Sequence, residues 1–599
     1  MSKKVKHFYA FGSFRLDLEE RLLTQEGRPV PLAPKVFDTL LLLIERRGRV
    51  VGKDEMMSLL WPDRFVEESN LTQNVFTLRK ALDEGVDKIQ CIETIPRRGY
   101  RFVAPVSELQ EEVAAPAGGD FTPPGEAAGE ESAARREEAV TSLAVLPMSL
   151  ESDDPDVEFL TDGLTESIIN SLSRLRHLRV VARSVVFDYK GQKVEPQKVA
   201  RALGTDAVLV GRALLMGNVL IIRAELVDAA NGWQIWGDQY TRPLSDILKV
   251  QDEIAASISE RLLSKLSADE KGQLGKHHTE NPDAYQLYLK GRYYWNKRTA
   301  EGYRRAIEEF ERAVRLDPAY ALAYSGLADS YVAYDFYGIL PPWEISPKAK
   351  DAAIQALSID DTLAEAHTSL ACVKMMYERD WAGAEREFRR AVELDPTYAH
   401  AHNWYAHFLM AMGRIEESFA QSQMALRLDP LDDSVNQYLG WHYIHARQFD
   451  RAIGQLEKTL AHKPDFFLAR TTLGMAYVQR GDFEKGIEEF EKARRVESPS
   501  LLTAFLGHAY AMAGRLDEAT SALEELKELS KRTYVPPYSI ALIHTALNEK
   551  KEAFEWFEVA YAGQNEWLNW IKVAPEVDSL RGDERFTDLM RRLDLEPDE

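Results

Sequence analysis

The sequence predicts a multidomain chain whose three parts differ in fold class: an α+β module, then a small α/β domain, then an all-α repeat solenoid. Three observations lead to this prediction. The 599 residues exceed what one hydrophobic core usually supports. Hydrophobic residues (45%) and charged residues (28%) occur in the proportions of folded protein. A period of 34 residues runs through much of the C-terminal half, which is typical of a repeat architecture.

The net charge of -22 is unevenly distributed along the chain. Residues 1–106 contain 18 Lys and Arg against 15 Asp and Glu, a net of +3, which leaves 56 against 81, a net of -25, for the rest. Because a phosphate backbone repels negative charge, only the N-terminal module is suited to approach nucleic acid.

Cysteine usage and hydropathy exclude several classes of protein. Cys91 and Cys372 lie far apart with no zinc-ligand spacing nearby, which argues against a disulfide framework or a structural zinc site. The N-terminus lacks the apolar core of a signal peptide. The most apolar stretch, 207–222, includes Arg212 and Asn218 and is shorter than the roughly 20 apolar residues of a spanning helix. We therefore expect a cytoplasmic protein with no membrane partner.

The N-terminal module begins with short strands over residues 8–32. A helix follows in APKVFDTLLLLIERRG and ends at Gly48, and a second, short helix covers 53–60. A third helix covers 71–82, where one apolar stripe predicts the buried face: Leu71, Val75, Leu78 and Leu82.

The other face of this third helix carries short polar and basic side chains. Such side chains can contact base edges and phosphates in a major groove, which admits one helix. The candidates for DNA contact on this recognition helix are Asn70, Gln73, Asn74, Thr77, Arg79 and Lys80.

Two strands, KIQCIETI and YRFVAPV, flank the turn Pro96-Arg97-Arg98-Gly99 and predict a hairpin with two arginines at its tip. Arg101 follows on the second strand. Any one of these arginines could equally belong to a solvated basic edge. As a group beside the polar helix, Arg97, Arg98 and Arg101 favour DNA contact.

Helix, loop, helix and hairpin together resemble the winged helix-turn-helix of OmpR/PhoB-type response regulators. The motifs that carry the resemblance are LAPKVFDTLLLL, GRVVGKDEMMSLLWP, NLTQNVFTLRKAL and IETIPRRGYRFVAPV. The resemblance implies that residues 1–106 bind double-stranded DNA, with the third helix in the major groove and the wing arginines at the adjacent minor groove or its phosphates. Phe76 and Thr77 replace residues that are often basic in that family, so its base preference does not carry over.

Residues 107–140 are rich in Ala, Gly, Pro and Glu and predict a flexible linker. Residues 141–268 then alternate strand and helix patterns and end in three strands, over 207–216, 219–228 and 233–240. Asp153 and Asp154 imitate the acidic pair of a phosphate receiver, but no aspartate ends a third buried strand, so we reject phosphotransfer. Motifs such as FLTDGLTESIINSLSRL and VARALGTDAVLVGRA resemble the TolB-like, or FlgO-like, α/β domain, which implies an architecture and no ligand.

Pro396, Pro430 and Pro464 follow helix ends at intervals of 34 residues, the tetratricopeptide period. Small and large residues recur at fixed interior positions, as in Ala384, Phe388 and Ala391. We expect about eight repeats over 280–565, one lengthened turn at DFYGILPPWEI, and an amphipathic capping helix within 566–599.

Motifs of enzyme chemistry are missing from the sequence: it holds no GxxxxGK[ST], HExxH or GxSxG. The histidine-rich stretch, His400, His402, His407, His442 and His445, has spacings that place its members on different helix faces, so we interpret them as polar members of repeat helices and not as metal ligands. We expect no enzyme, no cofactor and no metal.

The leading hypothesis is a DNA-binding transcriptional regulator whose repeats bind a protein or peptide on their concave face, with RNA polymerase as a further candidate partner. The alternative is a signalling scaffold in which the winged helix docks a protein instead of DNA. A third hypothesis, a cyclase-like signalling enzyme, rests on the domains that accompany such cyclases, but no segment here is left to house a cyclase domain.

Overall fold

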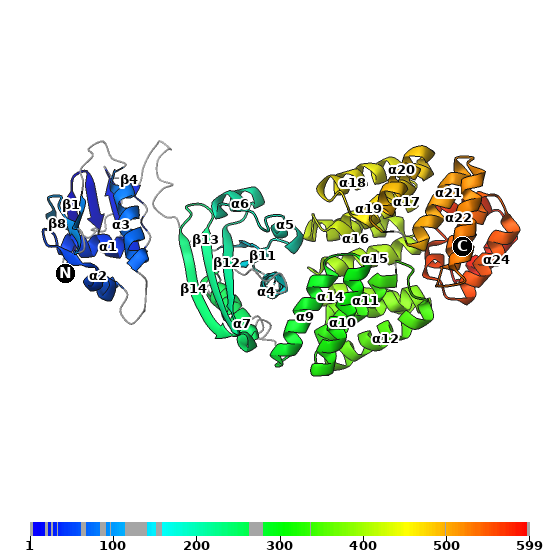
Figure 1. The fold of residues 1–599 in the computed structure, drawn as a ribbon, viewed down its shortest axis with the longest axis horizontal. Helices are drawn as coiled ribbons and strands as arrows, with labels where there is room; N and C mark the ends of the chain where they lie inside the picture. Colours follow the sequence, from blue (N-terminus) through cyan, green and yellow to red (C-terminus); the bar gives the residue numbers. More distant parts are fainter. Residues whose placement is uncertain are drawn as a thin grey trace, which may run out of the picture. The chain divides into compact units, whose positions relative to one another are not determined.

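The computed structural model describes residues 4–17, 22–25, 28–30, 32, 34–60, 68–83, 91–95, 98–113, 140–150, 158–175, 177–262, 279–335, 337–497 and 499–595. The chain divides into two compact units, residues 1–137 and 138–599 (Figure 1). In the described part of the chain, no helix combines the length and apolar character needed to cross a bilayer.

The first unit begins with an antiparallel sheet whose strand order is β4-β3-β2-β1-β8. The strands are β1 (Lys4–Phe11), β2 (Phe14–Asp17), β3 (Leu22–Gln25), β4 (Arg28–Val30) and β8 (Ser107–Val113). β8 pairs with β1 from Ser107 to Val113, which corrects the predicted linker of 107–140. Those seven residues belong to the folded module because their backbone groups complete the edge of the sheet.

Three helices and a second sheet complete this unit: α1 (Pro34–Glu45), α2 (Lys53–Leu60), α3 (Glu68–Asp83), β5 (Val51–Gly52), β6 (Ile92–Ile95) and β7 (Gly99–Phe102). The sheet order is β5-β7-β6, so the predicted hairpin is present and is joined by the two-residue strand β5. Phe11 and Phe102 meet edge to face at 5.2 Å and link the two sheets through one core.

The second unit opens with a mixed sheet of order β11-β9-β12-β13-β14, in which β10 also pairs with β12. Its elements are β9 (Ser142–Val145), β10 (Ser149–Leu150), α4 (Glu158–Ser173), β11 (Arg179–Val180), α5 (Arg183–Phe187), α6 (Pro196–Leu203), β12 (Ala207–Met216), β13 (Val219–Asp228), β14 (Gln234–Pro243) and α7 (Ile247–Leu262). Buried and exposed residues alternate along β13, so one face of the sheet is covered and the other is open.

Eight helix pairs follow within the described residues: α9 (Pro282–Trp295) with α10 (Ala300–Leu316), α11 (Ala321–Asp335) with α12 (Pro342–Ile359), α13 (Ala364–Val373) with α14 (Trp381–Leu394), α15 (Ala399–Ala411) with α16 (Ile415–Leu428), α17 (Asp433–His445) with α18 (Phe449–His462), α19 (Phe467–Arg480) with α20 (Phe483–Arg494), α21 (Ser500–Met512) with α22 (Leu516–Leu529), and α23 (Pro537–Ala546) with α24 (Lys550–Ala562). The predicted repeat solenoid is therefore confirmed. A Cβ added to Gly474 would lie 2.6 Å from Phe490, which shows how closely the two helices of a pair approach.

The C-terminal residues differ from the single capping helix predicted within 566–599. Two 3-10 turns, η4 (Glu566–Trp570) and η5 (Pro575–Leu580), come first, and only α25 (Glu584–Arg592) is α-helical. Pro575 begins the second turn and Asp583 caps α25, accepting a hydrogen bond from the Arg585 backbone N–H. Because Pro575 and Asp583 each favour the start of a new helical element, the segment forms separate short turns and a helix in place of one continuous helix.

Candidate nucleic-acid interface

The predicted stripe of α3 forms its buried face. Leu71, Val75, Leu78 and Leu82 all lie in the core of the first unit. This burial fixes the rotation of α3 about its own axis. The side chains of Asn70, Gln73 and Lys80 lie outside the described residues, as does Arg97.

Asn74 contacts α1, whereas the sequence predicted that its side chain points outward to DNA. Its Nδ2 donates to the Lys35 carbonyl at 3.3 Å and to Thr39 Oγ1 at 3.2 Å. The reason is helical phase, because position 74 lies beside the apolar stripe and not opposite it. Thr77 is half-buried. Asn74 therefore joins α3 to α1.

Arg79 and Arg101 contact the hairpin. Arg79 donates to the Ile92 carbonyl at 3.1 Å and to Thr94 Oγ1 at 2.7 Å, both on β6. Arg101 on β7 pairs with Glu93 on β6, with Nη2 and Oε2 2.5 Å apart. Both guanidinium groups thus have partners inside the module, and Arg79 holds the wing against the recognition helix.

The wing tip carries Arg98, whose side chain is exposed and whose backbone N–H donates to the Ile95 carbonyl at 3.0 Å. Gly99 follows with φ of 152°, and a Cβ there would lie 1.9 Å from the Val51 carbonyl oxygen. Only glycine allows β7 to approach β5 this closely, so Gly99 sets the position from which the wing arginines project.

Three arginines that our sequence analysis did not select are also exposed. Arg46, Arg47 and Arg49 occupy the turn after α1, directly before the strand β5 that pairs with the wing. Arg46 lies 3.8 Å from Glu55, and Arg47 lies over the ring of Tyr9. The sequence RRGR was visible as a basic cluster, but only the pairing of β5 with β7 shows that it lies next to the wing strand.

The histidine-rich stretch lies inside the repeats on α15 and α17. Burial lowers the pKa of His442 to about 3, and His407 contacts it, Nδ1 to Nε2, at 3.1 Å. Burial also lowers the pKa of His445 to about 3. Neutral rings therefore pack here as core groups. Among the residues that the structure describes, no group of His, Cys, Asp or Glu is arranged to hold a metal ion.

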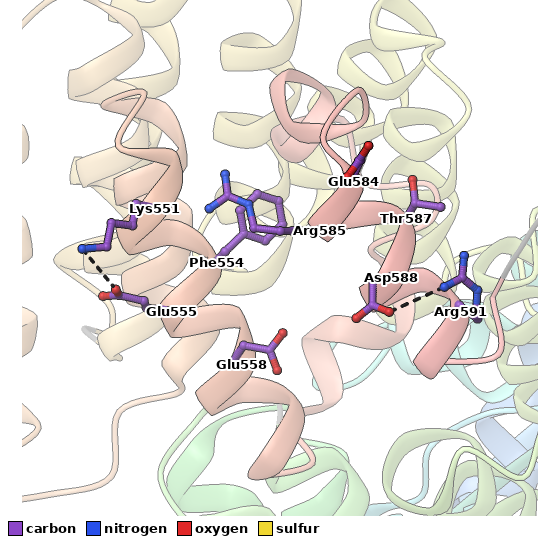
Figure 2. Close-up of a pocket in the computed structure, with 9 residues that line it drawn as sticks. All are labelled: Lys551, Phe554, Glu555, Glu558, Glu584, Arg585, Thr587, Asp588 and Arg591. Atoms are coloured by element: carbon purple, nitrogen blue, oxygen red, sulfur yellow. Dashed lines mark ion pairs between the residues drawn. The ribbon is translucent and has the colours of Figure 1, made fainter.

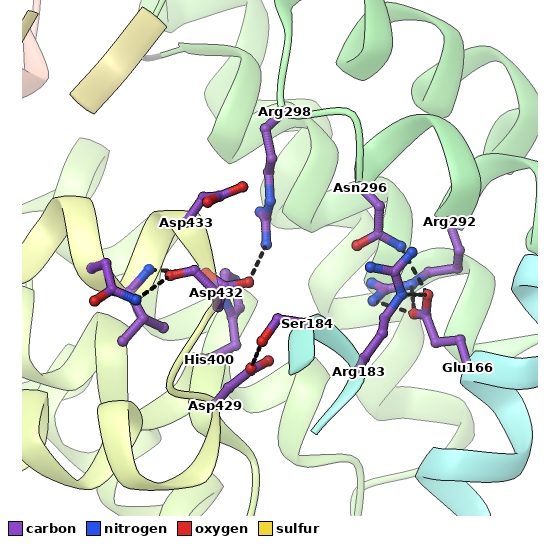
Figure 3. Close-up of polar contacts among 12 residues, drawn as sticks. Glu166, Arg183, Ser184, Arg292, Asn296, Arg298, His400, Asp429, Asp432 and Asp433 are labelled. Carbon is purple, nitrogen blue, oxygen red and sulfur yellow. Dashed lines mark hydrogen bonds and ion pairs between the residues drawn. The ribbon is translucent and has the colours of Figure 1, made fainter. Parts of the chain in front are cut away.

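The middle domain is joined to the repeats by a buried ionic cluster (Figure 3). Glu166 on α4 contacts Arg183 at 2.9 Å, Arg292 at 2.7 Å and Asn296 at 2.8 Å. Burial alone would raise the pKa of Glu166, but the two arginines outweigh it and lower the pKa to about 2. Beside this cluster, Gly163 allows α4 to pack directly against Leu289 of α9. The middle domain and the first repeat therefore form one folded body.

An open groove lies between α24 and α25 at the end of the repeats (Figure 2). Arg585 lies over the ring of Phe554 at 4.3 Å, and Lys551 lies 3.8 Å from Glu555. Asp588 and Arg591 form another pair, at 3.6 Å. Because both signs of charge alternate and pair locally, the groove does not select an anion or a cation.

Three family models match successive parts of the chain. Residues 27–102 match "Transcriptional regulatory protein, C terminal". Residues 139–257 match "HilA/YgeH-like transcriptional regulator, second domain". Residues 376–433, 439–501 and 471–532 match "Tetratricopeptide repeat". These matches define the class of the protein: a DNA-binding transcriptional regulator with an OmpR/PhoB-type winged helix and tetratricopeptide repeats.

Individual relatives match the chain over different lengths. The chain is 24% identical to the transcriptional regulator HilA of Salmonella typhi over 425 residues, 70% of each chain. It is 35% identical, over 190 residues, to a Rhizobium meliloti protein described as an adenylate cyclase, and it spans only 32% of that relative. The DNA-binding domain of Escherichia coli CadC aligns with 18% of this chain and 98% of that one, at 26% identity and a TM-score of 0.17. The protein is HilA-like in its order of domains.

Proposed function

We propose that the first unit binds double-stranded DNA with α3 in the major groove and the wing at the neighbouring backbone. The observation that carries this proposal is the orientation of α3: its apolar stripe is buried against the core, so the opposite positions are directed away from the module. The net charge of +3 over residues 1–106, against -25 elsewhere, supports the same surface.

Within this interface we propose different roles for the nine candidate residues. Gln73 and Thr77 are proposed to contact base edges, and Asn70 and Lys80 to contact DNA from the same helix. Arg97 and Arg98 are proposed to contact phosphate. Asn74, Arg79 and Arg101 are proposed as positioning residues, because each has a hydrogen-bond partner within the module that holds helix or wing in place.

For the second unit we propose that the repeats bind a protein or peptide and so connect DNA binding to a signal, with RNA polymerase as one candidate. We also propose that residues 141–268 form a TolB-like α/β domain. The buried Glu166 cluster supports treating the middle domain and the repeats as a single sensor body.

The test is a salt titration of DNA binding by the full chain, first on sites selected from a random-sequence pool and then on unrelated duplexes. The Arg97→Ala/Arg98→Ala double variant should bind all sequences more weakly, and the slope of log K against log salt should fall by about one per lost phosphate contact. Gln73→Ala or Thr77→Ala should lose roughly 1 to 3 kcal/mol on the selected site and little on unrelated DNA.

The matched control is Arg304→Ala/Arg305→Ala, which removes two exposed arginines from α10 in the repeats and should leave DNA binding unchanged. Wild-type affinity and slope in the Arg97/Arg98 variant would show that the wing does not contact DNA. Absence of binding of the wild-type chain to any duplex would instead favour the alternative, a scaffold whose winged helix docks a protein.

A further inference from the structure

From α11 to α23, the first helix of each repeat pair is buried on most of its sides. Successive first helices contact one another, α11 with α13, α13 with α15 and so on to α23, and form the inner layer of the curved stack. In α15, eleven of thirteen residues are buried, whereas in its partner α16 only three of fourteen are. An open concave surface would leave one side of α15 in water, so another part of the protein covers this layer.

Residues 565–570, here called the inner segment, supply part of that cover. Trp570 lies 4.8 Å from the ring of His407 on α15 and 5.5 Å from that of Trp441 on α17. Trp567 lies 6.0 Å from Phe505 on α21. The inner segment therefore contacts the first helices of the fourth, fifth and seventh repeats, which are α15, α17 and α21.

The inner segment also makes a polar contact with a special feature of the third repeat. Asn569 is fully buried, and its Nδ2 donates to the carbonyls of Met375 at 3.1 Å and Met376 at 3.0 Å. Both carbonyls belong to a π-helical turn, Lys374–Glu378, that ends α13. A π-helical turn changes the pattern of backbone hydrogen bonds, so it can present carbonyls to a side chain from elsewhere.

The lengthened turn after α11 crosses the same surface. Tyr337 stacks on Phe467 of α19 at 6.1 Å, and Gly338 approaches Pro536, where an added Cβ would lie 3.1 Å from Cγ. This turn is the DFYGILPPWEI insertion of the sequence. The chain thus covers its inner layer with two of its own segments.

A void beside the inner segment shows that its aromatic side chains do not fill the space against the repeats. The small, mainly apolar cavity lies between Trp567, Trp570, Phe467 and Leu502, and a void deprives its lining of packing contacts. A partner segment that fills this cavity would therefore gain contacts that the inner segment lacks.

We propose that the inner segment is an intramolecular ligand of the repeats, and that the partner of the concave surface is a protein segment of the same chemistry. That chemistry is two aromatic side chains three residues apart with a carboxamide between them, presented on one helical turn. The proposal rests on the proposed function, in which the repeats bind a protein or peptide. The partner displaces the inner segment, which makes the segment autoinhibitory.

The experiment uses the full chain with Asn569→Asp, which places a carboxylate against two carbonyl oxygens. The probe is a fluorescent peptide of residues 563–572 with the native sequence. We expect the variant to bind it at least tenfold more tightly than the wild type, and to show faster hydrogen exchange over 565–570 with unchanged exchange in α15 and α17. A probe carrying Asp at its own Asn569 position should bind the variant at least tenfold more weakly than the native probe.

The matched control is Asn231→Asp, the same change in a turn of the middle domain. There the side-chain oxygen accepts from the Trp233 N–H, and aspartate keeps that acceptor oxygen. It should behave as the wild type. Loss of protection in α15, or release of the segment with no gain in peptide binding, would overturn the proposal, because the segment would then be part of the core. DNA binding is measured on the same samples, so a failure of the proposed DNA-binding function is detected separately.

Discussion

Replacing Glu166 by Gln should weaken the attachment of the middle domain to the repeats. The carboxylate neutralises Arg183 and Arg292, and Gln would leave two partly buried guanidinium groups without their counter-charge. The pKa of Glu166 falls from an ordinary 4.5 to about 2 in the folded protein. At about 1.4 kcal/mol per pKa unit, the carboxylate stabilises the folded state by roughly 3 kcal/mol at neutral pH.

The assay is urea unfolding of the full chain, followed by tryptophan fluorescence at pH 7 and at pH 3. The matched control is Glu301→Gln on α10. The pKa of Glu301 is also lowered to about 2 by Arg304 and Arg305, but Glu301 is fully exposed, so its replacement should have little effect. Because the pKa of Glu166 is lowered in the folded protein, its contribution is present above pH 4.5 and is lost as the pH falls toward 2.

The difference between wild type and Glu166→Gln should therefore shrink at pH 3. Equal stabilities of the Glu166 and Glu301 variants at pH 7 would refute the reasoning. So would a Glu166 effect that grows on acidification.

Three further predictions concern the sheet edge, the helix approach and the buried carboxylates. A fragment of residues 1–113 should melt cooperatively in circular dichroism at a higher temperature than one of residues 1–106, because β8 covers the edge of β1; equal melting temperatures would show that β8 is dispensable. Gly474→Ala should destabilise the chain by about 1 to 3 kcal/mol by contact with Phe490, whereas Gly454→Ala, with open space around it, should be neutral or stabilising by up to about 1 kcal/mol. Burial raises the pKa of Asp335 to about 7, and the Tyr377 hydroxyl donates a hydrogen bond to this carboxyl group. Burial and the nearby Asp335 also raise the pKa of Glu566 in the inner segment, which lies beside Asn565 and Tyr534. The contribution of Asp335 is thus full below pH 4 and lost as pH rises through about 7, so hydrogen exchange over 565–570 should speed up across that window in the wild type and much less in Asp335→Asn.

Local patterns predicted the elements whose boundaries depend on neighbouring residues. The strands predicted at 207–216 and 219–228 have the bounds of β12 and β13, because Gly217 and Asn218 form the turn between two alternating segments. The helix predicted at 53–60 is α2. In each case the signal and the structure that it produces lie within a few residues of each other.

Pairing between distant residues was not predictable in this way. SELQEEV is too polar to indicate a strand, and it becomes β8 because β1, about a hundred residues earlier, offers it an edge. Likewise, the sequence predicted that Arg79 contacts DNA because it lies on the polar side of a helix. In the structure, Arg79 donates to a carbonyl and to a hydroxyl on β6. The winged-helix module was thus predicted correctly, while the contacts of Asn74, Arg79 and Arg101 depended on neighbours that only the fold creates.

The inner layer of the repeats could have been detected from the sequence by a different comparison, that of the two helices within each pair. The second helix α18 alternates apolar and charged residues at helical spacing, as expected for a helix with one side in water. The first helix α15, AHAHNWYAHFLMA, has no Asp, Glu, Lys or Arg, and nine of its thirteen residues are apolar. Such a composition is typical of a helix that is covered on most sides and not of one with a side in water. The composition of α15 therefore indicates a cover over the concave surface, and the chain's own Trp567 and Trp570 form part of that cover.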